Sequence, residues 1–132
     1  MMYNEDKRLD KTKNNLIEDT TTSKKNKDII LSYMEELTGK GLSVGRVQKF
    51  CSYLTRIAKI LKKDFSKANK DDIIRVLNEI ERLKVRAGSR KGKPLSDWAK
   101  HDYRLVIKTF YKWLRQKEID EDFMNSQKEM KK

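Results

Sequence analysis

Apolar residues recur every three or four positions in four stretches of the chain, with polar residues between them. This is the period of an amphipathic helix, so the pattern predicts four helices. The first covers about 26–38 and ends at Gly39-Lys40-Gly41, because glycine readily takes the left-handed conformation that closes a helix. The others begin at Ser43, Asn69 and Ser96, which are good N-cap residues.

The apolar face of each predicted helix has to pack against the other helices, because a short amphipathic helix is not stable alone in water. No alternating strand pattern competes with the helical one, and the single proline lies outside every predicted helix. The predicted fold is therefore all-α, a compact four-helix bundle with flexible termini. The residues expected in its core are Ile29, Ile30, Tyr33, Met34, Leu37, Val47, Phe50, Cys51, Leu54, Ile57, Ala58, Leu61, Ile73, Leu77, Ile80, Leu83, Leu105, Val106, Thr109, Phe110, Trp113 and Leu114.

Both ends of the chain lack a sustained apolar period. Residues 1–24 are polar, and we expect a flexible N-terminal arm in which Leu16 and Ile17 are the pair able to dock. Residues 25–117 hold the four predicted helices and form the domain. Residues 118–132 begin with a cluster of carboxylates and are expected to form an acidic linker or tail.

The charge of the chain is large and unevenly placed. The 132 residues carry 32 Lys or Arg and 20 Asp or Glu, which gives a net charge of +12. Residues 43–63 hold six basic and no acidic side chains, and residues 86–117 hold ten basic and two acidic ones. A surface that serves only solubility mixes its signs. The excess therefore marks a face that binds a polyanion, and nucleic acid is the expected class.

Several classes of function are excluded by what the chain lacks. No apolar run approaches the ~20 residues of a membrane helix, and there is no signal-peptide pattern at the N-terminus, so we expect a cytoplasmic protein. Cys51 and His101 are the only residues of their types, which excludes an internal disulfide and argues against a His/Cys metal site. Asp71-Asp72 and the carboxylates of 118–122 lack a further ligand pattern, so no metal or cofactor is expected.

The basic residues of the second and fourth predicted helices fall on one face of each helix, at steps of three, four or seven. A basic glycine-containing loop precedes the fourth helix, and a serine begins each of the two helices with free backbone N–H groups that suit a phosphate. Two such stripes could neutralise several phosphates of duplex DNA. The predicted DNA-binding residues are Ser43, Arg46, Lys49, Tyr53, Arg56, Arg90, Lys91, Lys93, Ser96, Lys100, His101, Arg104 and Lys108.

Three segments resemble one protein family in order and spacing. The stretch GLSVGRVQKFCSYL at 41–54 is similar to the pattern G-L-S-x-x-T-x-x-x-Y-x-x-x-L of tyrosine recombinases (phage integrases and Xer-type proteins). Residues 69–77 resemble the x-x-D-I-x-x-F-L helix that follows it, and FYKWL at 110–114 matches the F-Y-x-W-L ending of the last main helix. The chain departs from the pattern at Arg46, Phe50 and Ala99, which concerns individual contacts and not the architecture.

The resemblance implies the N-terminal core-binding domain of this family, also called the SAM-like domain. In the family this domain forms half of a clamp around duplex DNA and faces it with its second and fourth helices. The catalytic residues belong to a separate C-terminal domain, so the chain by itself is not expected to be an enzyme. The implied partners are double-stranded DNA, that catalytic domain and neighbouring recombinase subunits, with a monomer expected in isolation and no membrane.

His101 and Arg104 spell an H-x-x-R box like one in the family's catalytic domain. They lie upstream of the FYKWL ending, where the family has no catalytic residue, so we interpret the match as chance. Side chains three positions apart on a helix share a face, and a DNA contact explains this pair better.

Two other hypotheses remain open. A basic helical protein-interaction module would use the same faces to meet an acidic partner or neighbouring subunits in an assembly. An RNA-binding bundle is less favoured because no aromatic platform for single-stranded bases is evident.

Overall fold

The computed structural model describes the backbone of residues 2–86 and 88–130, and the side chains of 7–86 and 88–127. The described residues form five α-helices and one short 3₁₀ helix without any β-strand, which confirms the predicted all-α class. The elements in chain order are α1 (Met2–Glu18), α2 (Lys24–Gly39), α3 (Val44–Leu61), η1 (Phe65–Lys67), α4 (Lys70–Arg82) and α5 (Asp97–Met130).

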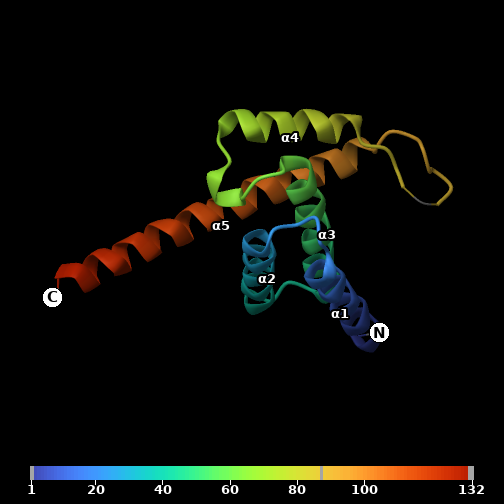
Figure 1. Cartoon of the computed structure of the whole chain (residues 1–132). Helices are drawn as coiled ribbons and strands as arrows, with labels where there is room; N and C mark the ends of the chain where they lie inside the picture. Colours follow the sequence, from blue (N-terminus) through green and yellow to red (C-terminus); the bar gives the residue numbers. More distant parts are fainter. Residues whose placement is uncertain (1, 87, 131–132) are drawn as a thin grey trace.

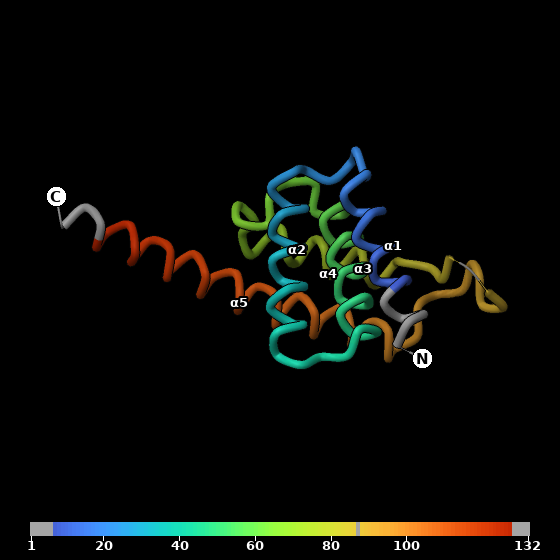
Figure 2. Tube along the Cα trace, turned by 90° about the horizontal axis from the view of Figure 1, so that it is seen from below, coloured from blue at the N-terminus to red at the C-terminus, as the bar shows by residue number. Residues whose placement is uncertain are grey.

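The central element is α3, which is packed by α1, α2, α4 and α5 (Figures 1 and 2). Its apolar face is completely buried, as the sequence pattern predicts, with Cys51 and Leu54 at 0% exposure. Phe65 of η1 and Phe110 of α5 meet beside it edge to face, with ring centroids 4.8 Å apart. The core therefore lies around α3, and the other helices surround it.

The predicted flexible arm is wrong, because most of residues 1–24 form helix α1 and the start of α2. α1 packs along α3 and buries Leu9 and Leu16 against it. These two leucines lie seven positions apart, so they fall on one helix face two turns apart. Among the described side chains of α1, residues 7–18, these two anchors are too sparse to produce a periodic pattern, and the docking depends on the partner surface that α3 supplies.

The predicted end of the last helix near 117 is also wrong, since α5 continues to Met130 and leaves the body of the bundle (Figure 2). The segment expected to be an acidic tail contains no glycine or proline, so nothing in it stops a helix. The last two residues of the expected tail lie outside the described residues.

The predicted helix starts are confirmed in their capping geometry. The hydroxyl of Ser43 accepts the backbone N–H of Arg46 at 3.3 Å and begins α3. Asn69 and Asp72 form a reciprocal capping box at the start of α4. Gly41 has φ +87°, a left-handed conformation that favours glycine and closes the link between α2 and α3.

The predicted core is right for most positions, but on α5 the predicted Leu105 and Thr109 are exposed. Leu105 is 39% exposed, whereas Tyr103 and Ile107 are buried. The reason is that the Tyr103 ring stacks on Tyr53 of α3, which turns the buried face of α5 toward 103, 106, 107, 110 and 114. A similar shift on α4 buries Val76.

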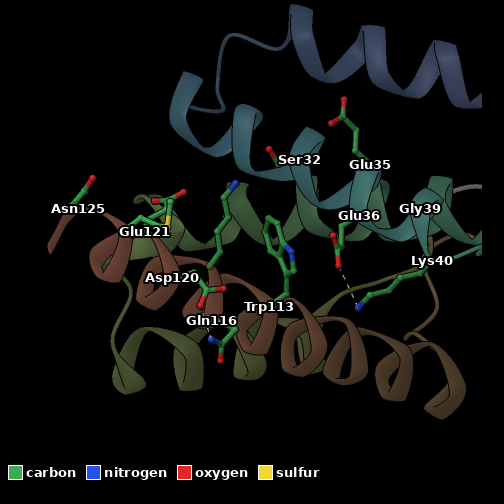
Figure 3. A pocket seen from close by; sticks show the side chains of 12 residues that line it. Ser32, Glu35, Glu36, Gly39, Lys40, Trp113, Gln116, Asp120, Glu121 and Asn125 are labelled. Carbon is green, nitrogen blue, oxygen red and sulfur yellow. Dashed lines mark hydrogen bonds and ion pairs between the residues drawn. The ribbon is translucent and has the colours of Figure 1, made fainter. Parts of the chain in front are cut away.

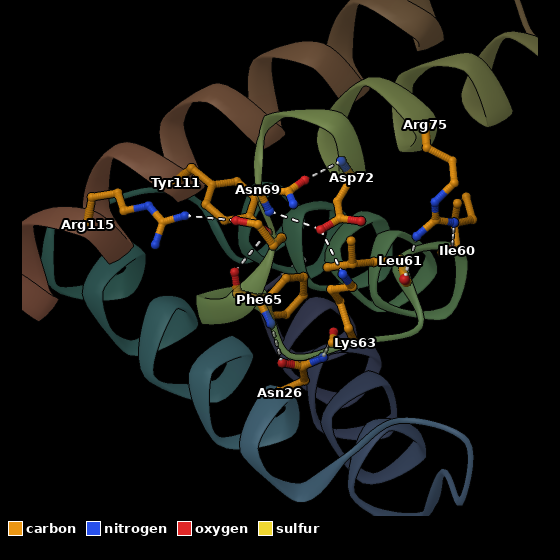
Figure 4. Close-up of polar contacts among 11 residues, drawn as sticks. Asn26, Ile60, Leu61, Lys63, Phe65, Asn69, Asp72, Arg75, Tyr111 and Arg115 are labelled. Carbon is orange, nitrogen blue, oxygen red and sulfur yellow. Dashed lines mark hydrogen bonds and ion pairs between the residues drawn. The ribbon is translucent and has the colours of Figure 1, made fainter.

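Buried polar contacts fix the turn between α3 and α4 (Figure 4). The buried Asn26 side chain donates to the carbonyl of Lys63 at 3.0 Å and accepts from the backbone N–H of Phe65 at 2.9 Å. Tyr111 donates its hydroxyl to the Phe65 carbonyl at 3.2 Å, and Arg115 donates to the Ala68 carbonyl at 3.1 Å. α2 and α5 are thereby tied to the same turn, which sets the position of α5 relative to α3.

Candidate nucleic-acid interface

The two predicted basic stripes meet where the start of α5 crosses α3. The rings of Tyr53 and Tyr103 stack with centroids 4.0 Å apart and an interplanar angle of 7°. Arg56 donates from its guanidinium to the Tyr103 hydroxyl at 3.2 Å. Lys49 Nζ lies 2.5 Å from Asp102 Oδ2 and 5.7 Å from the centroid of the Tyr53 ring. The structure therefore brings Lys49, Tyr53 and Arg56 together, but as part of the α3–α5 contact.

This contact corrects the prediction of a fully free stripe on α3. Tyr53 and Arg56 are half-buried, and burial raises the pKa of the Tyr53 hydroxyl. The prediction took every position opposite the apolar face as solvent. It did not foresee that α5 covers part of the flank of α3 in addition to its apolar face.

A carboxylate on α4 holds two of the predicted cations on α5. Lys100 Nζ lies 3.1 Å from Glu81 Oε2, and Arg104 pairs with the other oxygen of Glu81. The hydrogen bond from Lys100 is the main cause that lowers the pKa of Glu81. Such solvent-accessible pairs contribute little to stability, so phosphates can compete for the two cations.

The remaining predicted cations are exposed. Within the part of the chain that the structure describes, their side chains have no ion-pair partner, so their charge is available to a ligand. These residues, called the free cations below, are Arg46, Arg90, Lys91, Lys93 and Lys108.

The two serines and the histidine of the prediction lie at helix starts. Ser96 accepts the backbone N–H of Ala99 at 3.1 Å, just as Ser43 caps α3, so each hydroxyl oxygen is already engaged and keeps its own proton to donate. His101 is exposed and stacks on the Trp98 ring at a centroid distance of 5.9 Å. Trp98 itself is 74% exposed.

A groove of about 990 Å³ runs between α1, α3 and α4. Thr12 and Asn15 of α1 contribute polar groups to its wall, while Asp19 and Glu79 are the only carboxylates among the described residues that line it. The cations that line this cationic groove are Arg56, Lys59, Lys62, Arg75 and Arg86.

Sequence reasoning missed four of these five cations. Lys59 and Lys62 were counted in the basic segment 43–63 but lie off the predicted stripe. Lys59 pairs with Asp19 at 3.5 Å, and Arg75 donates to the carbonyls of Ile60 and Leu61 at the end of α3. The docking of α1 supplies one wall of the groove, and the sequence indicated that docking only through the pair Leu16 and Ile17, without a helical pattern.

The segment predicted as a basic loop before α5 is a hairpin, called the basic finger below (residues 83–95). Val85 donates its backbone N–H to the Lys93 carbonyl at 2.8 Å and accepts that of Gly92 at 2.9 Å. Leu95 donates to the Leu83 carbonyl at 3.3 Å and closes the base. The finger extends from the helices in both overall views (Figures 1 and 2), and Ala87 within it lies outside the described residues.

A second cleft, of about 1130 Å³, lies between α2 and the later part of α5 and has the opposite charge (Figure 3). Its lining is net negative beside the Trp113 ring, because two lysines face four carboxylates: Lys40 and Lys117, with Glu35, Glu36, Asp120 and Glu121. Carboxylates repel phosphate, so this acidic cleft does not suit a nucleic acid. The charges of the molecule are therefore sorted between two separate surfaces.

The described residues hold no group of three His, Cys, Asp or Glu side chains arranged to bind a metal ion. No helix among them is long and apolar enough to cross a membrane. Comparison of the chain with protein-family models, curated proteins and solved structures finds no match.

Proposed function

We propose that the chain is a duplex-DNA-binding domain, of the SAM-like core-binding kind that tyrosine recombinases carry. The observation that supports this most directly is the set of free cations on α3, the basic finger and α5, next to the cationic groove. Positive charge concentrated on one group of neighbouring elements attracts a polyanion and lets several phosphates be contacted at once.

The resemblance to the recombinase family adds support from the sequence. The G-L-S segment leads into α3 through the cap at Ser43, and the FYKWL segment buries Phe110 and Leu114 in the core. In this proposal α3 and α5 are the second and fourth helices of the family's domain, and α1 is an addition to its four-helix bundle. A catalytic domain from the same parent protein would grip the other side of the DNA during integration or recombination.

Phosphate contacts dominate binding in this proposal, so affinity should fall steeply with salt. Each neutralised phosphate contributes about −0.9 to the slope of log K against log salt concentration. If all five free cations contact phosphates, the slope is therefore about −4 to −5.

The test reverses two free cations on different helices. Arg46→Glu/Lys108→Glu should weaken binding to a 20–30-base-pair duplex by at least tenfold at low salt and flatten the slope by about 2. The fold should survive, since both side chains are exposed and a carboxylate in the first turn of α3 suits the helix dipole. Fluorescence anisotropy across a salt series measures both quantities.

A matched control is available on α2. Lys24→Glu/Lys25→Glu changes the net charge equally, at exposed positions outside the predicted face. Equal losses of affinity in the two double variants would show that only net charge matters and would refute the proposed face.

A second candidate function is a helical protein-interaction module. It is favoured by the acidic cleft and by the exposed apolar side chains of Ile119, Phe123 and Met124 on the adjoining part of α5. Failure of the folded wild-type domain to bind duplex DNA at low salt would favour this function over the first.

A further inference from the structure

Backbone hydrogen bonds hold the basic finger in a defined conformation. Its arms are held by the backbone hydrogen bonds between Val85 and residues 92 and 93, and an isolated antiparallel bridge joins Lys84 to Pro94. Near the tip, Lys91 donates its backbone N–H to the Gly88 carbonyl at 3.2 Å. Gly88 and Gly92 both have φ +85°, a conformation that L side chains rarely adopt and that glycine supplies without strain.

The base of the finger is anchored and its tip is free. Leu83 and Leu95 are half-buried and pack against the core, so the two ends of the hairpin move with the bundle. Between these anchors, the described residues from 86 to 94 are all exposed. Six residue-to-residue steps separate Leu83 from Ser89, so the tip lies at most about 20 Å from the base at ~3.3 Å per step.

The finger carries positive charge without compensation. Between Arg82 and Asp97 the sequence contains no carboxylate, so every charged side chain in the finger is a cation. None of these cations forms an ion pair with another described residue. The five are Lys84, Arg86, Arg90, Lys91 and Lys93.

We propose that the basic finger enters the major groove of the bound duplex, an inference that rests on the proposed DNA-binding function. The major groove is roughly 12 Å wide and 8.5 Å deep and admits a two-stranded ribbon, whereas the minor groove is only about 6 Å wide. The arms of the finger are paired through their backbones, so they enter as a ribbon of two chains. The upper limit of about 20 Å exceeds the groove depth of roughly 8.5 Å, so the tip can reach the floor of the major groove while the base stays on the bundle.

In this proposal the residues of the finger make different contacts with the duplex. Lys84 and Lys93 lie on the arms near the base, at the height of the phosphates that border the groove. Arg90 lies near the tip, and a guanidinium can donate two hydrogen bonds to the O6 and N7 acceptors of guanine, which only the major groove presents. The exposed indole of Trp98, the second residue of α5, follows the finger closely in sequence and offers an apolar contact to the DNA edge.

The experiment places a thiol at the tip and asks which groove it reaches. Ser89→Cys is an exposed substitution next to the turn, and it leaves the cations of the finger in place. Duplexes carry a thiol tether either on cytosine N4, in the major groove, or on guanine N2, in the minor groove. Each tether is supplied as a mixed disulfide with a small thiol; the introduced thiolate attacks the tether sulfur, the protein–DNA disulfide forms and the small thiol leaves.

The native cysteine does not interfere with this reaction. Cys51 is fully buried, and burial raises the pKa of its thiol to about 11, so it stays protonated and shielded at neutral pH. Lys25→Cys on α2 serves as the matched control, an exposed thiol away from the finger that should cross-link to neither tether.

The expected result is cross-linking of Ser89→Cys to the cytosine N4 tether at least tenfold faster than to the guanine N2 tether. Faster reaction with the minor-groove tether would overturn the proposal, and so would equal rates for Ser89→Cys and Lys25→Cys while anisotropy shows that both bind DNA. If anisotropy detects no binding by the folded protein, the proposed function fails and the finger proposal falls with it. Binding without groove-selective cross-linking refutes the finger proposal alone.

Discussion

The docking of α1 can be tested with two neighbouring residues that differ mainly in burial. Leu16 is 2% exposed and packs in the core, whereas Ile17, the next residue, is 54% exposed. Truncation of each to alanine removes a similar amount of apolar side chain from the same helix. If α1 packs as the structure shows, only the first truncation leaves a cavity.

The expected magnitudes are well separated. A buried Leu→Ala substitution costs about 2–5 kcal/mol, from lost burial and from the cavity that remains. An exposed substitution such as Ile17→Ala stays within about 0.5 kcal/mol of wild type. With a urea m-value of about 1–3 kcal/mol per M, Leu16→Ala should lower the denaturation midpoint by at least about 0.7 M.

Two assays read the result. Urea denaturation followed by circular dichroism gives the free energy of unfolding of each variant. The reaction rate of the Cys51 thiol with a disulfide reagent reports locally, because Lys13 of α1 lies close enough to Cys51 to influence the pKa of its thiol. Leu16→Ala should raise that rate and Ile17→Ala should leave it near the wild-type value. Equal, small effects of both variants would mean that residues 1–18 are the flexible arm predicted from the sequence.

Three further predictions concern single side chains. Asn26→Asp keeps the acceptor for the Phe65 N–H but loses the donor to the carbonyl of Lys63, so unfolding free energy should drop by about 1–3 kcal/mol in urea titrations at neutral pH. Asp19→Asn should destabilise the protein at pH 7, because hydrogen bonds from a neighbouring threonine hold the pKa of the Asp19 carboxyl well below its usual range. A carboxyl group whose pKa is lower in the folded protein stabilises the fold at pH values above its ordinary pKa of about 4, and this stabilisation is lost as the pH falls below that value. The urea midpoints of the variant and the wild type should therefore converge as the pH falls below about 4. Glu81→Gln should tighten duplex binding several-fold at low salt by releasing two cations of α5, and an unchanged affinity would exclude these cations from the interface.

The helical class and three of the helix starts followed from the sequence because their causes are local. Ser43, Asn69 and Ser96 each accept a backbone N–H three residues on, an interaction within a single turn of chain. The apolar face of α3 was identified position by position, since seven core residues within one helix produce an unmistakable period. Local hydrogen bonding and dense periodicity are the properties that sequence patterns record.

The predictions from the sequence were wrong where contacts between residues far apart in the chain determine the structure. α1 has two buried leucines and depends on α3 to dock, so its own pattern is too weak to predict it. Asn26 is a buried polar residue whose partners are distant in sequence: its side chain donates to the carbonyl of Lys63 in the turn after α3, nearly forty positions away. No periodicity encodes such a contact.

For the cations of the candidate site, the sequence likewise predicts which side chains lie opposite the apolar face but not which partners they meet. A helical wheel separates buried from exposed positions, but it does not reveal which neighbour faces an exposed cation. Four helices pack around α3, so little of its surface is exposed. Lys49 pairs with Asp102 of α5, and Arg56 donates to the Tyr103 hydroxyl of α5. On α5, Lys100 and Arg104 form ion pairs with Glu81 of α4. The cations that stay free are therefore those at helix ends, on the outer face of α5 and on the basic finger, and these peripheral elements, more than the centre of α3, supply the charge that a duplex can contact.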